Sequence, residues 1–378
     1  MKKRIIATVC GLVMMASLLT GCGGKTATDE MTGSSIETAD AEAEVETEAE
    51  AETETEVNEA STDISEDEDI LDDFAIPEYE TDVTIRIGGL KGPTSIGLLN
   101  LKNRAMAGEA GQNYEFTMAT AADEITTALV KGELDIALIP ANVASVLYNK
   151  TEGQITVIDI NTLGVLYMVS GDTSVSSPED LRGKTVYLTG KGTTPDYVLQ
   201  YILGQNGVLE DVTLEYKSEA TEVAAVLAED ETAIGLLPQP FVTVATTKNE
   251  NLSVIMDMTA EWDKVQGENG SRLLTGVTVV RNDFLNDHPV AVDAFLYDHK
   301  ESIAETMDNL NEVADYAVEE EIIASSQIAM KAIPECNITY IDGNDMKQAL
   351  AGYLEVLYEL DPKSVGGALP GDDFYLVK

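Results

Sequence analysis

Several residue types on which catalysis and metal binding depend are scarce in this chain. It has 378 residues but only two histidines, three cysteines and one tryptophan. His288 and His299 lack the spacing of a metal motif such as H-E-x-x-H, and a role at a helix surface or cap is expected for both. No nucleophile-elbow, phosphate-loop or complete dinucleotide-binding signature is present. We therefore predict that the chain is not an enzyme and has no metal or cofactor.

Basic residues are also few. The chain has 23 lysines and arginines against 68 aspartates and glutamates, a net charge of −45. From residue 83 onward, 45 acidic and 19 basic residues still leave a net charge of about −26. Because binding to a phosphate backbone needs a basic face, we expect no nucleic-acid partner.

The start of the chain has the pattern of an export signal. Lys2-Lys3-Arg4 precedes an apolar run from Ile5 to Leu19, which is too short to span a bilayer as a mature helix. The following Leu19-Thr20-Gly21-Cys22 resembles the bacterial lipobox, so residues 1–21 are predicted to be removed and Cys22 to carry a lipid anchor. An ordinary cleaved signal is the alternative. Because Cys10 is lost with the signal and Cys22 is acylated, Cys336 has no disulfide partner. It also has no obvious basic neighbour, so a catalytic thiol is not expected there.

An acidic segment follows the anchor. Residues 29–82 contain 23 acidic and no basic side chains, with few aromatic residues to bury. Such composition favours a solvated, self-repelling chain. We predict that residues 22–82 are a disordered tether, or a spacer that only solubilises the protein.

The remainder, from residue 83, alternates short apolar runs with helical patterns and is long enough for two lobes. This alternation predicts an α/β protein with mainly parallel sheets flanked by helices. Ser177-Pro178-Glu179-Asp180 also has the pattern of a helix start. Strands are expected at 83–90, 114–118, 135–140, 155–160, 164–169, 185–188, 212–216 and 233–238, and helices at 94–107, 123–131, 142–148, 195–203 and 221–228.

The second half of this pattern repeats the first. "LKGPTSIGLL" at 90–99 corresponds to "GKGTTPDYVL" at 190–199, because each places Lys-Gly-x-Thr between a strand and a helix. "DIALIPANVASV" at 135–146 corresponds to "AIGLLPQPFVTV" at 233–244, an apolar strand that ends in proline before a helix. Two matches in the same order and at nearly the same offset indicate duplicated lobes, with coincidence as the alternative.

The repeated corners predict where a ligand binds. In open α/β sheets, ligands bind where strands end and helices begin, so facing lobes would form a cleft between corners 91–95, 140–142, 189–194 and 238–241. In the first corner, free N–H groups and hydroxyls of Thr94 and Ser95 would face a ligand. The alternative is that Gly92-Pro93 is only a tight corner and that Thr94 caps the helix.

At this point the chain resembles a known family. The lipoprotein start, "SPEDLRGKTVYLTGKG" at 177–192, "LLPQPFVTVA" at 236–245 and "GVTVVRNDFLNDHPVAVDAFL" at 276–296 are similar to solute-binding proteins of ABC importers. Within these, the chain most resembles the nitrate, sulfonate and thiamine-precursor branch of the type II periplasmic-binding-protein fold. The resemblance implies a first lobe from 83–168 and 272–378, which includes C-terminal helices, and a second lobe from 169–271. It also implies that the lobes close on a solute by a hinge motion.

The resemblance also implies a set of binding residues. Lys91 and Lys191 would attract an anionic group, unless both point outward and only solvate their loops. Phe241 and Trp262 would supply a stacking wall, although Trp262, in a predicted loop after Met258, would equally cover a hydrophobic seam. Hydroxyl, amide and side-chain contacts are expected from Thr94, Ser95, Asn142, Thr189, Thr193, Thr194 and Gln239.

These features together predict an extracytoplasmic, lipid-anchored monomer at the cell membrane. It would capture a small anionic or heteroaromatic solute and pass it to an ABC permease with its ATPase. One alternative is a receptor that reports solute to a membrane signalling partner. Another is a biosynthetic enzyme on the same fold, although such relatives depend on cysteine and histidine clusters that this chain lacks.

Overall fold

The computed structural model describes residues 76–267 and 270–378. Its strands are β1 Thr84–Leu90, β2 Asn113–Ala119, β3 Ile136–Pro140, β4 Ile155–Leu163, β5 Leu166–Ser170, β6 Thr185–Thr189, β7 Thr213–Lys217, β8 Ile234–Pro238, β9 Ser253–Asp257, β10 Leu274–Arg281 and β11 Ile338–Ile341. Its α-helices are α1 Leu99–Ala107, α2 Ala122–Val130, α3 Ala141–Lys150, α4 Thr194–Gln205, α5 Ala220–Glu229, α6 Phe241–Lys248, α7 Met258–Gln266, α8 Asn282–Asp287, α9 Pro289–Ala304, α10 Leu310–Glu319, α11 Ser326–Ala332 and α12 Gly343–Leu360. Short 3-10 helices include η1 Pro93–Leu98, η2 Pro178–Leu181, η5 Ile333–Glu335 and η6 Pro362–Val365.

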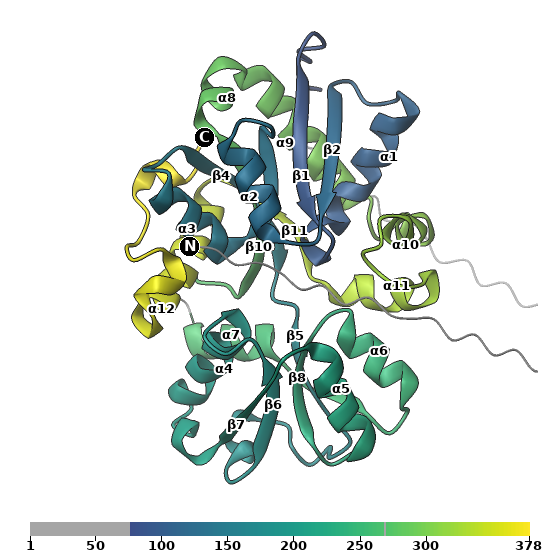
Figure 1. Cartoon of the computed structure of the whole chain (residues 1–378), viewed down its shortest axis with the longest axis vertical. Coiled ribbons are helices and arrows are strands. Elements are labelled where there is room, and N and C mark those ends of the chain that lie inside the picture. The colour runs from purple at the N-terminus through teal and green to yellow at the C-terminus, as the bar shows by residue number, and fades with distance from the viewer. Residues whose placement is uncertain (1–75, 268–269) are drawn as a thin grey trace, which may run out of the picture. The chain divides into compact units, whose positions relative to one another are not determined.

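The described strands form two sheets, one in each lobe. The first lobe has a six-stranded sheet in the order β11-β4-β10-β3-β1-β2, and the second has a five-stranded sheet in the order β7-β6-β8-β5-β9. Figure 1 shows helices on both faces of each sheet, with the second lobe drawn below the first. The architecture confirms the predicted two-lobed α/β fold.

The duplication predicted from the sequence is confirmed by the strand order. In both lobes the strand second from one edge of the sheet pairs in parallel with its two neighbours, β1 with β2 and β3, and β6 with β7 and β8. The two Lys-Gly-x-Thr corners follow β1 and β6. Both sheets are mixed rather than mainly parallel, because β10, β4, β5, β9 and β11 run antiparallel to their neighbours. Most of these antiparallel strands lie next to the two places where the chain passes between the lobes.

The chain leaves the first lobe earlier than the sequence analysis expects. β4 ends at Leu163 in the first sheet, and β5 begins at Leu166 in the second. Met168, predicted to close the first lobe, therefore lies within the second lobe. Residues 155–170 are mostly apolar throughout, so their sequence does not indicate that β4 and β5 pair in different sheets. The return near Leu274, where β10 begins, agrees with the expectation.

The last residues of the acidic segment are attached to the first lobe. The Tyr79 phenol donates to Asp298, and the Gln112 side chain both accepts from Glu80 N–H and donates to the Glu80 carbonyl. The ring of Tyr79 also lies against Gly111, where a Cβ would be only 2.5 Å from it. These contacts correct the boundary at residue 82, since the folded part starts at or before residue 79. The rest of the predicted tether and the export signal lie outside the described residues.

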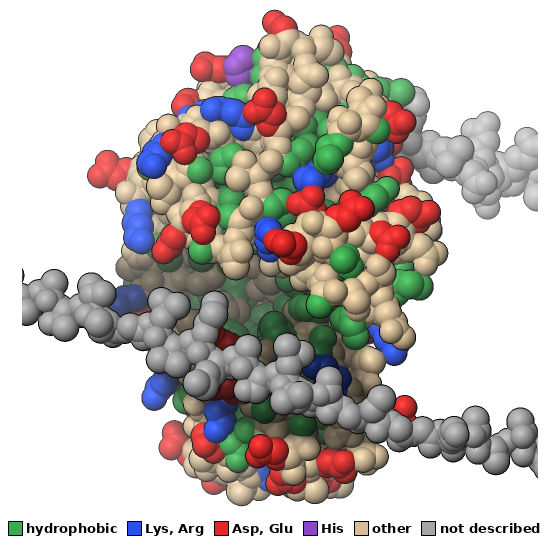
Figure 2. All heavy atoms as spheres, turned by 45° about the vertical axis from the view of Figure 1, so that its right-hand side comes forward, with side chains coloured by type: hydrophobic (Ala, Val, Ile, Leu, Met, Phe, Trp, Pro, Cys, Tyr) green, Lys and Arg blue, Asp and Glu red, His purple; other side chains and the backbone are tan. Residues whose placement is uncertain are grey.

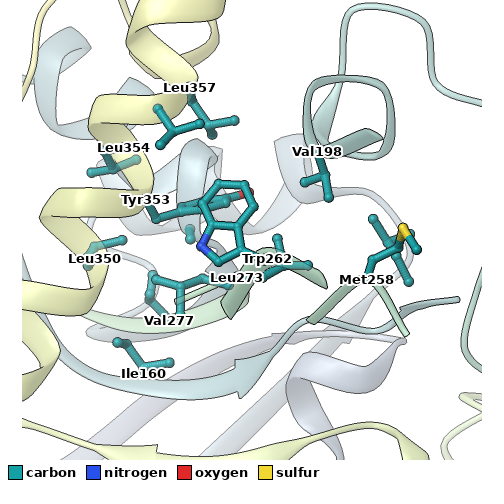
Figure 3. Close-up of a cluster of buried hydrophobic side chains, with 14 of the residues drawn as sticks. Ile160, Val198, Met258, Trp262, Leu273, Val277, Leu350, Tyr353, Leu354 and Leu357 are labelled. Carbon is teal, nitrogen blue, oxygen red and sulfur yellow. The ribbon is translucent and has the colours of Figure 1, made fainter. Parts of the chain in front are cut away.

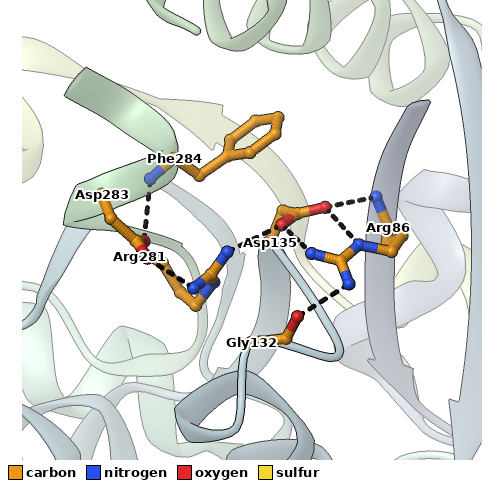
Figure 4. A network of polar contacts seen from close by, with 6 residues as sticks. All are labelled: Arg86, Gly132, Asp135, Arg281, Asp283 and Phe284. Carbon is orange, nitrogen blue, oxygen red and sulfur yellow. Dashed lines mark hydrogen bonds and ion pairs between the residues drawn. The ribbon is translucent and has the colours of Figure 1, made fainter. Parts of the chain in front are cut away.

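An ionic clamp joins three strands of the first sheet at the end remote from the second lobe. Asp135, before β3, accepts from the backbone and guanidinium of Arg86 on β1 and from Arg281 on β10, as Figure 4 shows. Arg86 also donates to the Gly132 carbonyl at 2.7 Å. Burial of Asp135 would raise the pKa of its carboxyl, but the hydrogen bonds from Arg86 and Arg281 and the charge of Arg86 outweigh it and lower that pKa.

Other local predictions differ in detail. The helix expected at 94–107 begins as the 3-10 helix η1, and the helix start at Ser177 leads only to the four-residue η2. Trp262 lies within α7, not in a loop. No helix in the described part of the chain is both long enough and apolar enough to span a membrane.

Candidate functional site

The corner after β1 holds two buried hydroxyls without partners. Thr94 and Ser95 begin η1 and are 5% and 0% exposed, and neither hydroxyl makes a hydrogen bond within the described residues. The N–H of Ser95 is not free as expected, because it donates to the Gly92 carbonyl in the first turn. Lys91, beside them, forms an ion pair with Glu321. The corner therefore offers two free hydroxyls, whereas the Lys91 ammonium and the Ser95 N–H already have partners.

A chain of buried polar side chains lies behind this corner. A Cβ at Gly276 would lie 2.6 Å from the Thr94 methyl and 2.4 Å from Asn161 Oδ1, so glycine permits this close approach. Asn161 donates to Thr278, and Thr278 donates to Asp159 at 2.7 Å. Asp159 Oδ2 lies 3.2 Å from Nδ1 of His299. In the sequence, this network is indicated only by the polar residues that interrupt the apolar strand at 155–163.

Both histidines have partners in the first lobe. His299 is fully buried on α9, stacked on Phe295 with ring centroids 5.2 Å apart. The expected helix-surface role is therefore wrong for His299, because α9 turns this face onto the sheet. His288, between α8 and α9, lies 3.3 Å from Glu80. Among the described residues, no cluster of histidine, cysteine or acidic side chains is arranged to hold a metal ion.

The corner after β6 is shaped by an aspartate, Asp196, that is not among the predicted binding residues. Asp196, buried on α4, accepts from Gly192 N–H and from the Tyr216 phenol. Lys191 is exposed, and its ammonium lies 5.1 Å from the Tyr216 ring centre. The Thr193 hydroxyl donates to the Gly190 carbonyl at 2.5 Å. The corner is thus held mainly by its own hydrogen bonds.

The remaining predicted residues lie in different surroundings. Thr189 ends β6 beside Lys217 of β7. Asn142 on α3 donates to the Ser364 carbonyl at 3.5 Å. Phe241 lines a groove between α5 and α6 and packs on the apolar cluster of the second lobe.

Trp262 lies in an apolar seam between the lobes. It is 0% exposed, and its ring centre lies 4.9 Å from that of Tyr201 on α4 and 5.7 Å from that of Tyr353 on α12. Figure 3 shows the indole between α12 residues and Leu273. The indole N–H has no hydrogen-bond partner among the described residues. Burial raises the pKa of the Tyr353 phenol, and the neighbouring Thr194 side chain opposes this rise, which places that predicted residue beside the seam.

A second region where the lobes meet contains a cavity of about 480 Å³ against α6. The Tyr167 phenol donates across it to the Glu335 carbonyl at 2.8 Å and so joins β5 to the first lobe. Of the ten predicted binding residues, Gln239 lines this cavity, and the other nine do not. Residues of both lobes line it: Tyr167, Gln239, Val242, Thr243, Thr246, Thr247, Glu250 and Val254 from the second, and Lys331 and Glu335 from the first.

Comparisons with known proteins agree with this architecture. A family model described as "Menaquinone biosynthesis" matches residues 93–359. The structure of an ABC transporter from Parabacteroides distasonis is 24% identical, with a TM-score of 0.65 over 78% of this chain and 99% of that chain. The periplasmic aliphatic sulphonate binding protein of Escherichia coli is 15% identical, with a TM-score of 0.59 over 75% and 90%. The comparison with curated proteins found no match. The structural likenesses confirm the predicted periplasmic-binding-protein fold.

Proposed function

The chain belongs to the menaquinone biosynthesis family, and from that premise and its fold we propose that it binds a small solute between its lobes and delivers it to an ABC importer. The observation that carries this proposal is the cavity lined from both lobes. A molecule held there contacts both lobes at once, so its binding is coupled to their relative position. The likeness to an ABC transporter structure and a sulphonate-binding protein supports the same function.

The finer parts of the proposal come from the sequence. The protein is an extracytoplasmic monomer anchored through Cys22, and its partners are an ABC permease with its ATPase. Its solute is small and carries an anionic or heteroaromatic group. The side-chain amide of Gln239 and the hydroxyl of Thr247, which line the cavity, suit the oxygen atoms of such a group. Figure 2 shows acidic side chains spread over the visible surface of both lobes, which supports the expectation of no nucleic-acid partner.

Thermal unfolding of the purified full-length chain against a ligand panel tests the binding function. The panel contains sulfonates, nitrate, pyrimidines, carboxylates, amino acids and neutral analogues. A ligand present at a hundred times its dissociation constant is expected to stabilise the fold by about 2.7 kcal/mol and so raise Tm. Thr247→Val, which removes a hydroxyl that lines the cavity, should leave the stability of the ligand-free protein nearly unchanged but weaken an oxygen-bearing hit about fivefold. Thr127→Val, on exposed α2, is the control. Absence of a shift with every compound would contradict solute binding.

The lipid anchor has a separate test. Cys22→Ala is expected to move the protein from the membrane fraction to the soluble fraction, because the acylated thiol is the proposed attachment. Cys336→Ala is the matched control, since that thiol is buried in the first lobe. Membrane association that survives Cys22→Ala would show that another attachment exists.

The family description favours one second candidate, a biosynthetic enzyme. An enzyme would need acid–base or nucleophilic groups at the cavity. Among its described lining residues, the carboxylates of Glu250 and Glu335 are such groups, whereas histidine and cysteine are absent. Incubation of the protein with each compound that stabilises it, followed by mass spectrometry of that compound, separates the two functions. Turnover would establish an enzyme, and recovery of unchanged compound would favour binding.

A further inference from the structure

The cavity between the lobes carries charges of both signs that are not paired. Lys331 and Glu335 reach it from the end of α11 and η5, and Glu250 reaches it from the residues after α6. None of these three side chains makes a hydrogen bond or ion pair with another described residue. Lys331 and Glu335 are four positions apart, a spacing at which ion pairs form on helices, yet they remain separate here. One ammonium and two carboxylates are therefore available to a bound molecule.

A buried amide adds directed hydrogen bonds to this site. Gln239 is 4% exposed, and its side-chain oxygen accepts from the Thr243 hydroxyl at 2.9 Å. Its amide nitrogen donates to no described group, so both of its donors are free. That nitrogen is not one of the fully buried polar atoms, so it is open to the cavity. An acceptor atom of the solute would supply a partner.

The walls of the cavity come from two helices that face each other across the lobes. α6 and α11 are in contact, and Figure 1 shows α11 directly above α6. The volume of about 480 Å³ lies within the usual range of small-molecule sites. Val242, Val254 and Tyr167 add apolar surface to the polar lining.

From this lining we infer that the solute is a zwitterion, an inference that rests on the proposed binding function. Its anionic group pairs with Lys331 and accepts from Gln239, and its ammonium group pairs with Glu250 and Glu335. A simple anion would meet two carboxylates, and a simple cation would meet Lys331, so each would bring like charges together. A molecule with one charge of each sign avoids both repulsions. The predicted attraction of anions by Lys91 and Lys191 is not needed for this selectivity.

Alanine, dialanine and trialanine are suitable probes, because the same backbones can be prepared with one charge removed. N-acetylation removes the ammonium, and C-terminal amidation removes the carboxylate. Titration calorimetry with the full-length chain is expected to show that the best of the three binds about tenfold more tightly than either capped form. No binding of any of the three at millimolar concentration would overturn the inference. Equal binding of a capped form would do the same.

Two variants assign the charges. Lys331→Met is expected to weaken binding of the uncapped peptide and to abolish its higher affinity relative to the amide. Its higher affinity relative to the acetylated form should remain. Glu250→Gln should reduce the advantage of the uncapped peptide over the acetylated form and leave its advantage over the amide. The reduction should be partial, because Glu335 still pairs with the ammonium group. Lys131→Met and Glu229→Gln are controls at exposed sites away from the cavity. If Lys331→Met acts no more strongly than Lys131→Met, the inference is wrong. If a panel compound raises Tm equally in the wild type, Lys331→Met and Glu250→Gln, that result would support the binding function and contradict only the inference that the solute is a zwitterion.

Discussion

Replacing Asp135 by asparagine is expected to lower the free energy of unfolding by about 3 kcal/mol, because both Arg86 and Arg281 then lose their buried counter-charge. Asp135 is 1% exposed and accepts hydrogen bonds from strands β1 and β10. Urea denaturation at neutral pH measures the loss. Asp283→Asn is the control, since its side chain is 64% exposed and pairs with Arg281 only at the surface. That change should cost less than about 1 kcal/mol.

The same clamp predicts how stability depends on pH. The pKa of Asp135 is lower in the folded chain than its usual value of 3.8. Its stabilising contribution is therefore complete above the unfolded pKa, near pH 4, and is lost as the pH falls through the lower folded value. The wild type should lose this increment as the pH falls below about 4, and Asp135→Asn should not. Equal acid dependence of the two proteins would contradict the role of the clamp.

Much of the fold could be predicted because its signals are local. The apolar strand that ends in Pro140 and the helix that follows it are specified by neighbouring residues, and the matching stretch at Pro238 revealed the second lobe. Strand direction beside the crossings could not be predicted in this way. The pairing of β10 with β3 and β4 joins segments more than a hundred residues apart, and an apolar run does not encode its partner.

The candidate site was less accessible to sequence reasoning. Gln239 was found because it follows a strand and precedes a helix. Lys331 and Glu335 belong to the end of α11 and to η5, outside the repeated corners, and reach the cavity only through tertiary packing. Thr193 was selected by the same rule as Gln239, but its hydroxyl is bonded within its own turn. Position at a helix start is thus a useful signal, whereas the direction of a side chain depends on contacts distant in sequence.

Trp262→Ala is expected to lower the free energy of unfolding by about 4 kcal/mol, because it leaves a large cavity in the seam between α4, α7 and α12. Trp262→Phe should cost less, since it keeps much of the ring volume and removes an indole N–H that has no partner. Urea denaturation of both variants measures these losses. Val254→Ala, at a residue 46% exposed on β9, is the control and should have a small effect. Equal stability of Trp262→Ala and the wild type would show that the seam does not hold the lobes together.

The same residue makes movement of the lobes measurable, because it is the chain's single tryptophan. A fully buried indole should emit at short wavelength and be poorly quenched by acrylamide. If a solute acts by separating the lobes at this seam, its binding should shift the emission to longer wavelength and increase quenching. If the lobes instead move about the seam and open at the α6–α11 cavity, emission should stay constant while Tm rises. We expect constant emission, since Trp262, Tyr201 and Tyr353 form one continuous apolar contact, whereas at the cavity the Tyr167 phenol is joined to the first lobe by hydrogen bonds with Glu335 and Asn337. A red shift on binding would contradict the seam as the fixed side of the motion.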